Sequence, residues 1–184
     1  MKRLNNYIKE AFKVTANTKI NKISEYHYHP KTREELKELI QELIEERGNK
    51  ADLNDIDTSE ITDMSELFYG SNFNGDISCW NVGNVKYMQH MFRWSYFDGD
   101  ISNWDVSNVM SMIYMFYESD FTGKNGDISQ WDVSHLKYME GMFKHSKFTE
   151  DISNWDVSKV ITYKQAFTGC PIVRNKSKQP KFNI

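Results

Sequence analysis

The apolar residues between positions 52 and 172 follow a pattern that changes character partway through each repeat. In DISNWDVSNVMSMIYMF, residues 100–116, the first apolar side chains share one face of an extended chain and predict a short strand: Ile101, Trp104 and Val106. The later ones have the spacing of a buried helical stripe: Val109, Met112, Met115 and Phe116. Ser107 lies where an N-cap is expected. Each unit is therefore predicted to be a short strand, a turn and two turns of helix.

This pattern occurs five times along the chain. The tryptophans are spaced by 24, 27 and 24 residues, and one further step back reaches Ile56: Trp80, Trp104, Trp131 and Trp155. The other columns stay in register, among them an uninterrupted phenylalanine column: Phe68, Phe92, Phe116, Phe143 and Phe167. The three extra residues of the long unit lie in GKNG, 123–126, where a loop at one edge is expected.

A single unit cannot bury its apolar side alone, so the units are expected to stack and turn each column into a ladder through one core. The predicted fold class is an α/β repeat. It is a short leucine-rich-repeat-like solenoid of about five strand–turn–helix units over residues 52–172, with an N-terminal capping helix.

The flanking segments differ from the repeats. PKTREELKELIQELIEERG predicts an amphipathic helix over 31–48, with Thr32 as N-cap, Glu35 completing a capping box and Gly48 beyond the end. This helix is expected to cover the first unit, with partner binding as the alternative. Residues 1–30 are not placed, although LNNYIKEAF could form a short helix. Residues 173–184 form a basic tail that is expected to be mobile unless bound.

The repeated units WDVSNVxxMxxMF resemble those of the BspA-type leucine-rich repeat proteins, a family with members on bacterial surfaces. The resemblance covers residues 52–172. It implies a right-handed leucine-rich-repeat-like solenoid with a protein-binding or adhesive role, and it makes the cell surface one possible location. The start of the chain also resembles leader segments of phage virion proteins, which makes a virion another.

Composition narrows the function classes. The formal net charge of −3 argues against general nucleic-acid binding, which normally leaves a basic footprint. No apolar run approaches the roughly 18–20 residues that span a bilayer, and MKRLNNYIKEAFKV lacks the apolar stretch of a signal peptide. As written, the chain is expected to be cytoplasmic.

Motifs for catalysis are missing from the sequence. It has no glycine-rich phosphate loop, no HExxH and no nucleophile elbow. His27 and His29 are interpreted as a solvated pair because no further metal ligand lies nearby in sequence. Cys79 and Cys170 occupy distant units and different columns, so no disulfide is expected between them. We expect neither an enzyme nor a cofactor.

One polar column has two interpretations: Asp57, Asn81, Asp105, Asp132 and Asp156. The side chains could accept hydrogen bonds from turn amides, which would make the column a consequence of the repeated turn. Alternatively, the stacked oxygens could form a calcium- or glycan-binding surface, although calcium needs six to eight oxygens around one centre.

Function is better sought at positions where the units differ. Exposed aromatic and basic side chains gather at such positions and form the candidate contact surface: Tyr69, Arg93, Trp94, Tyr96, Tyr114, Tyr117 and Lys144. Tyr, Trp and Arg dominate the energetics of protein interfaces. The sequence therefore predicts a non-catalytic protein-interaction module of adhesion, adaptor or inhibitor type, whose partner is a protein of unknown identity. The alternative is that these rings only cover neighbouring loops.

Overall fold

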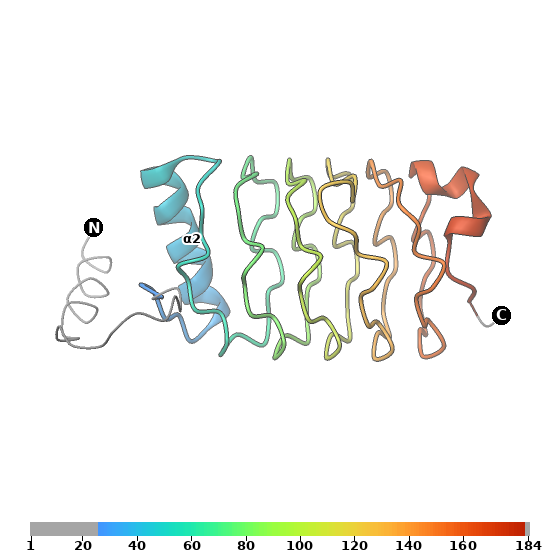
Figure 1. Ribbon diagram of the computed structural model, residues 1–184, viewed down its shortest axis with the longest axis horizontal. Coiled ribbons are helices and arrows are strands. Elements are labelled where there is room, and N and C mark those ends of the chain that lie inside the picture. The colour runs from blue at the N-terminus through green and yellow to red at the C-terminus, as the bar shows by residue number, and fades with distance from the viewer. Residues whose placement is uncertain (1–25, 183–184) are drawn as a thin grey trace, which may run out of the picture.

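The computed structural model describes residues 26–182 and consists of a row of five stacked units closed at both ends by short helices (Figure 1). Helix α2, Arg33–Arg47, lies at the N-terminal end of the row. Two 3₁₀ helices, η1 (Pro171–Arg174) and η2 (Lys176–Lys178), lie at the other end. The column residues between them are buried and form one continuous apolar core.

Helix α2 matches the helix predicted over 31–48. The amide of Glu35 donates to Thr32 Oγ1 at 3.2 Å, and the Glu35 carboxylate accepts from the Lys31 amide at 2.7 Å. Gly48 ends the helix with a φ of 87°. One face of the helix is buried in the core: Leu36, Leu39, Ile40 and Leu43. Since these side chains join the cluster that includes the first unit, α2 closes the apolar end of the stack.

The predicted α/β solenoid of strand–turn–helix units is wrong. Between residues 52 and 170, all of which the structure describes, there is no helix and no continuous strand. Strand pairing between successive units is limited to isolated parallel bridges: Asp52 with Asp76, Asp63 with Tyr87, Tyr87 with Ser111, Ser111 with Tyr138 and Tyr138 with Thr162. The expected strand is a pair of tight turns, because the Trp104 amide donates to the Ile101 carbonyl at 3.2 Å and Val109 to Val106 at 2.9 Å.

The expected helix is replaced by consecutive turns with left-handed residues at two columns, four positions apart. The first column has φ between 52° and 61°: Glu66, His90, Tyr114, Gly141 and Gln165. The second has φ between 50° and 70°: Gly70, Trp94, Glu118, His145 and Gly169. A left-handed residue cannot continue a right-handed helix. Hydrogen bonds between residues three apart, such as that from the Met91 amide to the Met88 carbonyl, close the turns. The apolar residues therefore recur at nearly the spacing of a helix, which explains the incorrect prediction.

Hydrogen bonds between units run in one direction along this turn segment. In the second unit, the amides of four alternate residues donate to the third unit at 2.9 Å each: Met88 to Ser111, His90 to Ile113, Phe92 to Met115 and Trp94 to Tyr117. The equivalent bonds occur at all four junctions between the five units. A regular parallel ladder shares donors and acceptors between both edges of a strand. Here these four amides all point toward the C-terminal end of the row, whereas the flanking amides of Lys86 and Tyr96 donate to the preceding unit.

The core is built from aromatic columns that connect neighbouring units. Each buried tryptophan donates its indole N–H to a carbonyl of the preceding unit at 2.9–3.2 Å, as Trp104 does to Ile77. Consecutive phenylalanines of the main column stack with centroids 5.4–6.0 Å apart. The repeated Trp and Phe residues therefore hold units together as well as filling space.

Both ends of the row are extended by segments outside the repeats. Tyr28 forms a parallel bridge with Ile56, so the segment around Tyr28 adds one further layer before the first unit, which we call the N-terminal rung. At the other end, the amide of Ile152 donates to the Lys178 carbonyl at 3.0 Å, and Phe182 stacks on Tyr163 at 3.9 Å. The part of the basic tail that the structure describes thus contacts the last unit at Lys178 and Phe182. The proposed helix LNNYIKEAF lies outside the described residues.

Candidate functional site

The guanidinium of Arg93 is the centre of an exposed aromatic cluster. It lies over four rings, with its central carbon 4.4 Å from the Trp94 ring centroid, 4.8 Å from Tyr117, and 5.7 Å from both Tyr69 and Tyr114. These residues belong to the first three units, so the stacking of the units brings them together. We call this set, together with Lys144, the Arg93 cluster.

The rings of the cluster contact one another edge to face. Tyr69 and Trp94 have centroids 5.3 Å apart, and Tyr114 and Tyr117 are 5.4 Å apart with an interplanar angle of 87°. Trp94 remains 44% exposed and Tyr69 42% exposed. Such large amphipathic rings on a surface are the usual anchors of protein interfaces.

Hydrogen bonds to acidic residues fix two of these rings in place. The indole N–H of Trp94 donates to Glu118 Oε2 at 3.1 Å, and the Tyr114 hydroxyl donates to Glu140 Oε1 at 3.5 Å. Each acceptor belongs to the unit after its donor. These two hydrogen bonds therefore hold the Trp94 and Tyr114 rings in a defined arrangement.

Arg93 has no carboxylate partner among residues 26–182. Its Nη1 donates to His90 Nδ1 at 3.4 Å, while its Nε is buried without a hydrogen-bond partner. Burial lowers the pKa of His90, and the neighbouring Arg93 charge lowers it further. His90 also stacks on Tyr114 at 5.5 Å. The cluster therefore presents a cation that is held by rings and a neutral imidazole.

Two members of the candidate surface occupy different places. Lys144 Nζ lies 5.6 Å from the Tyr117 ring centroid and donates to Gln165 Oε1 at 2.8 Å, so it extends the cluster toward the last unit. Tyr96 is 58% exposed but makes no ring contact with the cluster in the part of the chain that the structure describes. Sequence reasoning missed His90 and Glu118, which have no counterpart of the same type in their columns.

The polar column accepts hydrogen bonds from turn amides. The Asp105 carboxylate accepts from the Ser107 amide at 3.1 Å, and Asn81 accepts from Gly83 at 3.2 Å. The same bond forms at the other three positions: Asp57 with Ser59, Asp132 with Ser134 and Asp156 with Ser158. Within residues 26–182, no group of three or more His, Cys, Asp or Glu side chains is placed to hold a metal ion.

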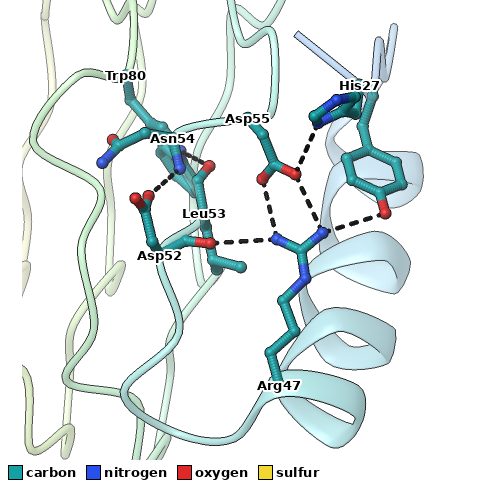
Figure 2. A network of polar contacts seen from close by, with 8 residues as sticks. His27, Arg47, Asp52, Leu53, Asn54, Asp55 and Trp80 are labelled. Carbon is teal, nitrogen blue, oxygen red and sulfur yellow. Dashed lines mark hydrogen bonds and ion pairs between the residues drawn. The ribbon is translucent and has the colours of Figure 1, made fainter. Parts of the chain in front are cut away.

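A second polar network joins the N-terminal rung, α2 and the first unit (Figure 2). Arg47 donates to both carboxylate oxygens of Asp55, at 3.1 and 3.0 Å, and to the Asp52 carbonyl and the Tyr28 hydroxyl, each at 3.2 Å. Asp55 also contacts His27 Nδ1 at 3.3 Å. Burial acts to raise the pKa of Asp55, but Arg47 outweighs it and the pKa is lowered. These groups are paired with one another, so we interpret the network as a structural connection between the N-terminal segment, α2 and the first unit.

The remaining sequence candidates are also placed. His29 contacts Asp57 at 3.2 Å and does not share a carboxylate with His27. Both cysteines are free thiols, Cys79 exposed and Cys170 buried. Among the helices of residues 26–182, none is both long enough and apolar enough to cross a membrane.

Comparison with known proteins gives one family. A family model described as "Mycoplasma protein of unknown function, DUF285" matches the chain twice, over residues 34–124 and 93–179. No curated protein and no solved structure matches the chain. The two overlapping matches together include all of α2 except Arg33 and all five units.

Proposed function

The chain belongs to this family, Mycoplasma protein of unknown function, DUF285, and we propose that it is a non-catalytic protein-interaction module that binds a protein partner through the Arg93 cluster. The single observation that carries the proposal is the placement of the Arg93 guanidinium among four rings, without a carboxylate partner in the described residues. The resemblance of the repeats to BspA-type surface proteins supports an adhesive or adaptor role.

The chemistry of the cluster supports this choice over a purely structural role. The half-buried Arg93 guanidinium has no carboxylate partner among residues 26–182 and so can attract a carboxylate of a partner, while Trp94 and Tyr69 offer exposed ring area around it. A charged group ringed by aromatic area is the arrangement of many interface hot spots.

Partner capture tests the proposal. The tagged protein is used to isolate partners from the native host, in parallel with the double variant Trp94→Ala, Tyr117→Ala. A matched control replaces two exposed tyrosines outside the cluster, Tyr87→Ala and Tyr138→Ala. The expected result is a specific protein captured by the wild type and the control, but not by the cluster variant. Equal capture by all three proteins would refute the role of the cluster.

The cluster variant is expected to remain folded, because Trp94 and Tyr117 lie outside the buried core. Its melting temperature should stay within a few degrees of the wild type. This control separates loss of binding from loss of structure.

A further inference from the structure

The last unit presents hydrogen-bond donors that have no acceptor among residues 26–182. In each earlier unit, four amides at fixed columns donate to the next unit. The corresponding amides of the fifth unit have no following unit: Tyr163, Gln165, Phe167 and Gly169. We call these four N–H groups the donor edge. These four amides face away from the fourth unit, because the equivalent amides of the earlier units donate to the following unit.

The tail covers only part of the donor edge. Phe182 stacks on Tyr163, and Phe167 is buried, whereas Gln165 and Gly169 are exposed. Both have positive φ, 61° and 70°. Amides arranged around left-handed residues form concave sites that favour anions and carbonyl oxygens. A hollow adjoins Gly169 and is lined by residues of the end cap: Cys170, Pro171, Val173 and Arg174.

The charge of this end of the chain matches the polarity of the donor edge. Residues 157–182 contain no Asp or Glu and carry six basic residues: Lys159, Lys164, Arg174, Lys176, Lys178 and Lys181. Residues 26–156 carry 24 acidic and 11 basic residues, so within the described part of the chain the excess of positive charge is confined to the C-terminal end of the row. The positive charge therefore attracts an acidic ligand to the same end of the row at which the backbone amides lack acceptors.

We propose that the donor edge, with the hollow beside Gly169, is a second binding surface that takes an extended acidic segment of a protein partner. Backbone carbonyls of the segment accept from Gln165 and Gly169, continuing the pattern of the internal junctions. Its carboxylates pair with basic residues of the cap such as Arg174. This surface adjoins the Arg93 cluster at Lys144, which donates to Gln165 Oε1, but the proposed contacts use the backbone amides of the last unit and the basic cap.

A second copy of the chain is a poorer occupant. The complementary carbonyl side of the row is at the first unit, where α2 packs over the end and Arg33 already donates to the Ser65 carbonyl at 3.3 Å. Two donor edges cannot pair with each other, because both present amides. End-to-end stacking would therefore require displacement of α2.

The test uses backbone amide NMR on the full chain, with a short polyglutamate peptide as probe and a glycine–serine peptide of equal length as control. In the free protein, Gln165 and Gly169 amides should exchange with solvent faster than their counterparts Glu66 and Gly70, which are bonded to the second unit. Polyglutamate should shift the Gln165 and Gly169 resonances and slow their exchange. The control peptide should do neither.

Gln165→Glu places a carboxylate beside the donor edge, keeps the contact with Lys144 as an ion pair, and should weaken polyglutamate binding about tenfold or more. Gln130→Glu, the same change at an exposed site in the fourth unit, should leave it unchanged. The proposal is overturned if Gln165 and Gly169 are as protected as Glu66 and Gly70 in the free protein, if polyglutamate shifts other residues only, or if Gln165→Glu binds like the wild type. Concentration-dependent dimers that Gln165→Glu abolishes would show a second copy as occupant, and would also overturn it.

Discussion

The indole N–H of Trp104 donates to the carbonyl of Ile77 in the preceding unit at 3.1 Å, while its ring stacks on that of Trp80 at 6.5 Å. One side chain thus supplies apolar volume, a ring contact and a polar bond across the same junction. This explains why the tryptophan is kept in four units. In the first unit, Ile56 takes its place and pairs through its backbone with Tyr28.

Trp104→Ala should lower the free energy of unfolding by about 3–5 kcal/mol, as other large-to-small changes in cores do. Trp104→Phe keeps an aromatic ring but removes one of the two donors to the Ile77 carbonyl, which still accepts from the Trp80 amide, so the lost hydrogen bond should cost about 0.5–1.5 kcal/mol. Urea denaturation of the three proteins measures both differences. A Trp104→Ala variant as stable as the wild type would contradict the role of this column.

Glycine substitutions distinguish the observed turns from the predicted helix. Gln165 has a φ of 61° and Lys164 beside it does not lie in the left-handed region. Gln165→Gly should therefore relieve backbone strain and raise the free energy of unfolding by between zero and about 1 kcal/mol. Lys164→Gly should lower it by about 0.5–1 kcal/mol. In a helix, both changes would destabilise to a similar degree. Thermal melts of the two variants give the comparison.

The sequence predicted which side chains are buried, but not the backbone that buries them. The columns containing Ile101, Trp104, Met112 and Phe116 are buried as expected, because their periodicity reports burial directly. The prediction of a helix in each unit was wrong because turns and helices share the i, i+3 spacing. In addition, His90 and Tyr114 are not residue types that indicate a positive φ. The repeating unit is stabilised by lateral bonds to its neighbours, and these are invisible to a pattern read along one unit.

The candidate surface was largely predictable for the same reason. Tyr69, Arg93 and Tyr117 share one column, so any stacked arrangement brings them together. The placement of Trp94 and Tyr114 against Arg93 depends on the left-handed turns, and the support from Glu118 and Glu140 depends on the register between units. These features depend on the three-dimensional arrangement of the units and leave no pattern in the sequence.

Replacing aspartate with asparagine in the polar column should change the free energy of unfolding very little. Asn81 already accepts from the Gly83 amide as Asp105 accepts from Ser107. Asp105→Asn should stay within a few tenths of a kcal/mol of the wild type, and Asp105→Ala should lose about 0.5–1.5 kcal/mol. Chemical denaturation without added metal measures both. Equal losses in the two variants would point to the negative charge as the feature that matters.

Calcium should not change the melting temperature. Each side chain of the polar column uses one oxygen to accept a hydrogen bond from its own turn. Within the described residues, no group of three or more His, Cys, Asp or Glu side chains is placed to hold a metal ion. Melts with calcium and with EDTA should coincide. A higher melting temperature in calcium that Asp105→Ala removes would contradict the structural role of the column.

The Arg47–Asp55 pair should contribute a pH-dependent part of the stability. Burial tends to raise the Asp55 pKa, but Arg47 holds it below its usual value, so the unfolded chain takes up the proton first as pH falls. The contribution is therefore present above the ordinary aspartate pKa of about 4 and is lost below it. The stability difference between wild type and Arg47→Gln, from urea titrations, should be constant near neutral pH and shrink below about pH 4. Arg174→Gln, an exposed control, should show no such change.

The central claim is that binding depends on the Arg93 cluster, where the units differ. Its most direct test is the calorimetric affinity of the captured partner for the wild type, for Trp94→Ala with Tyr117→Ala, and for Tyr87→Ala with Tyr138→Ala. We predict that the cluster variant binds at least about tenfold more weakly with an unchanged melting temperature, while the control binds like the wild type. Wild-type affinity in the cluster variant would contradict the claim.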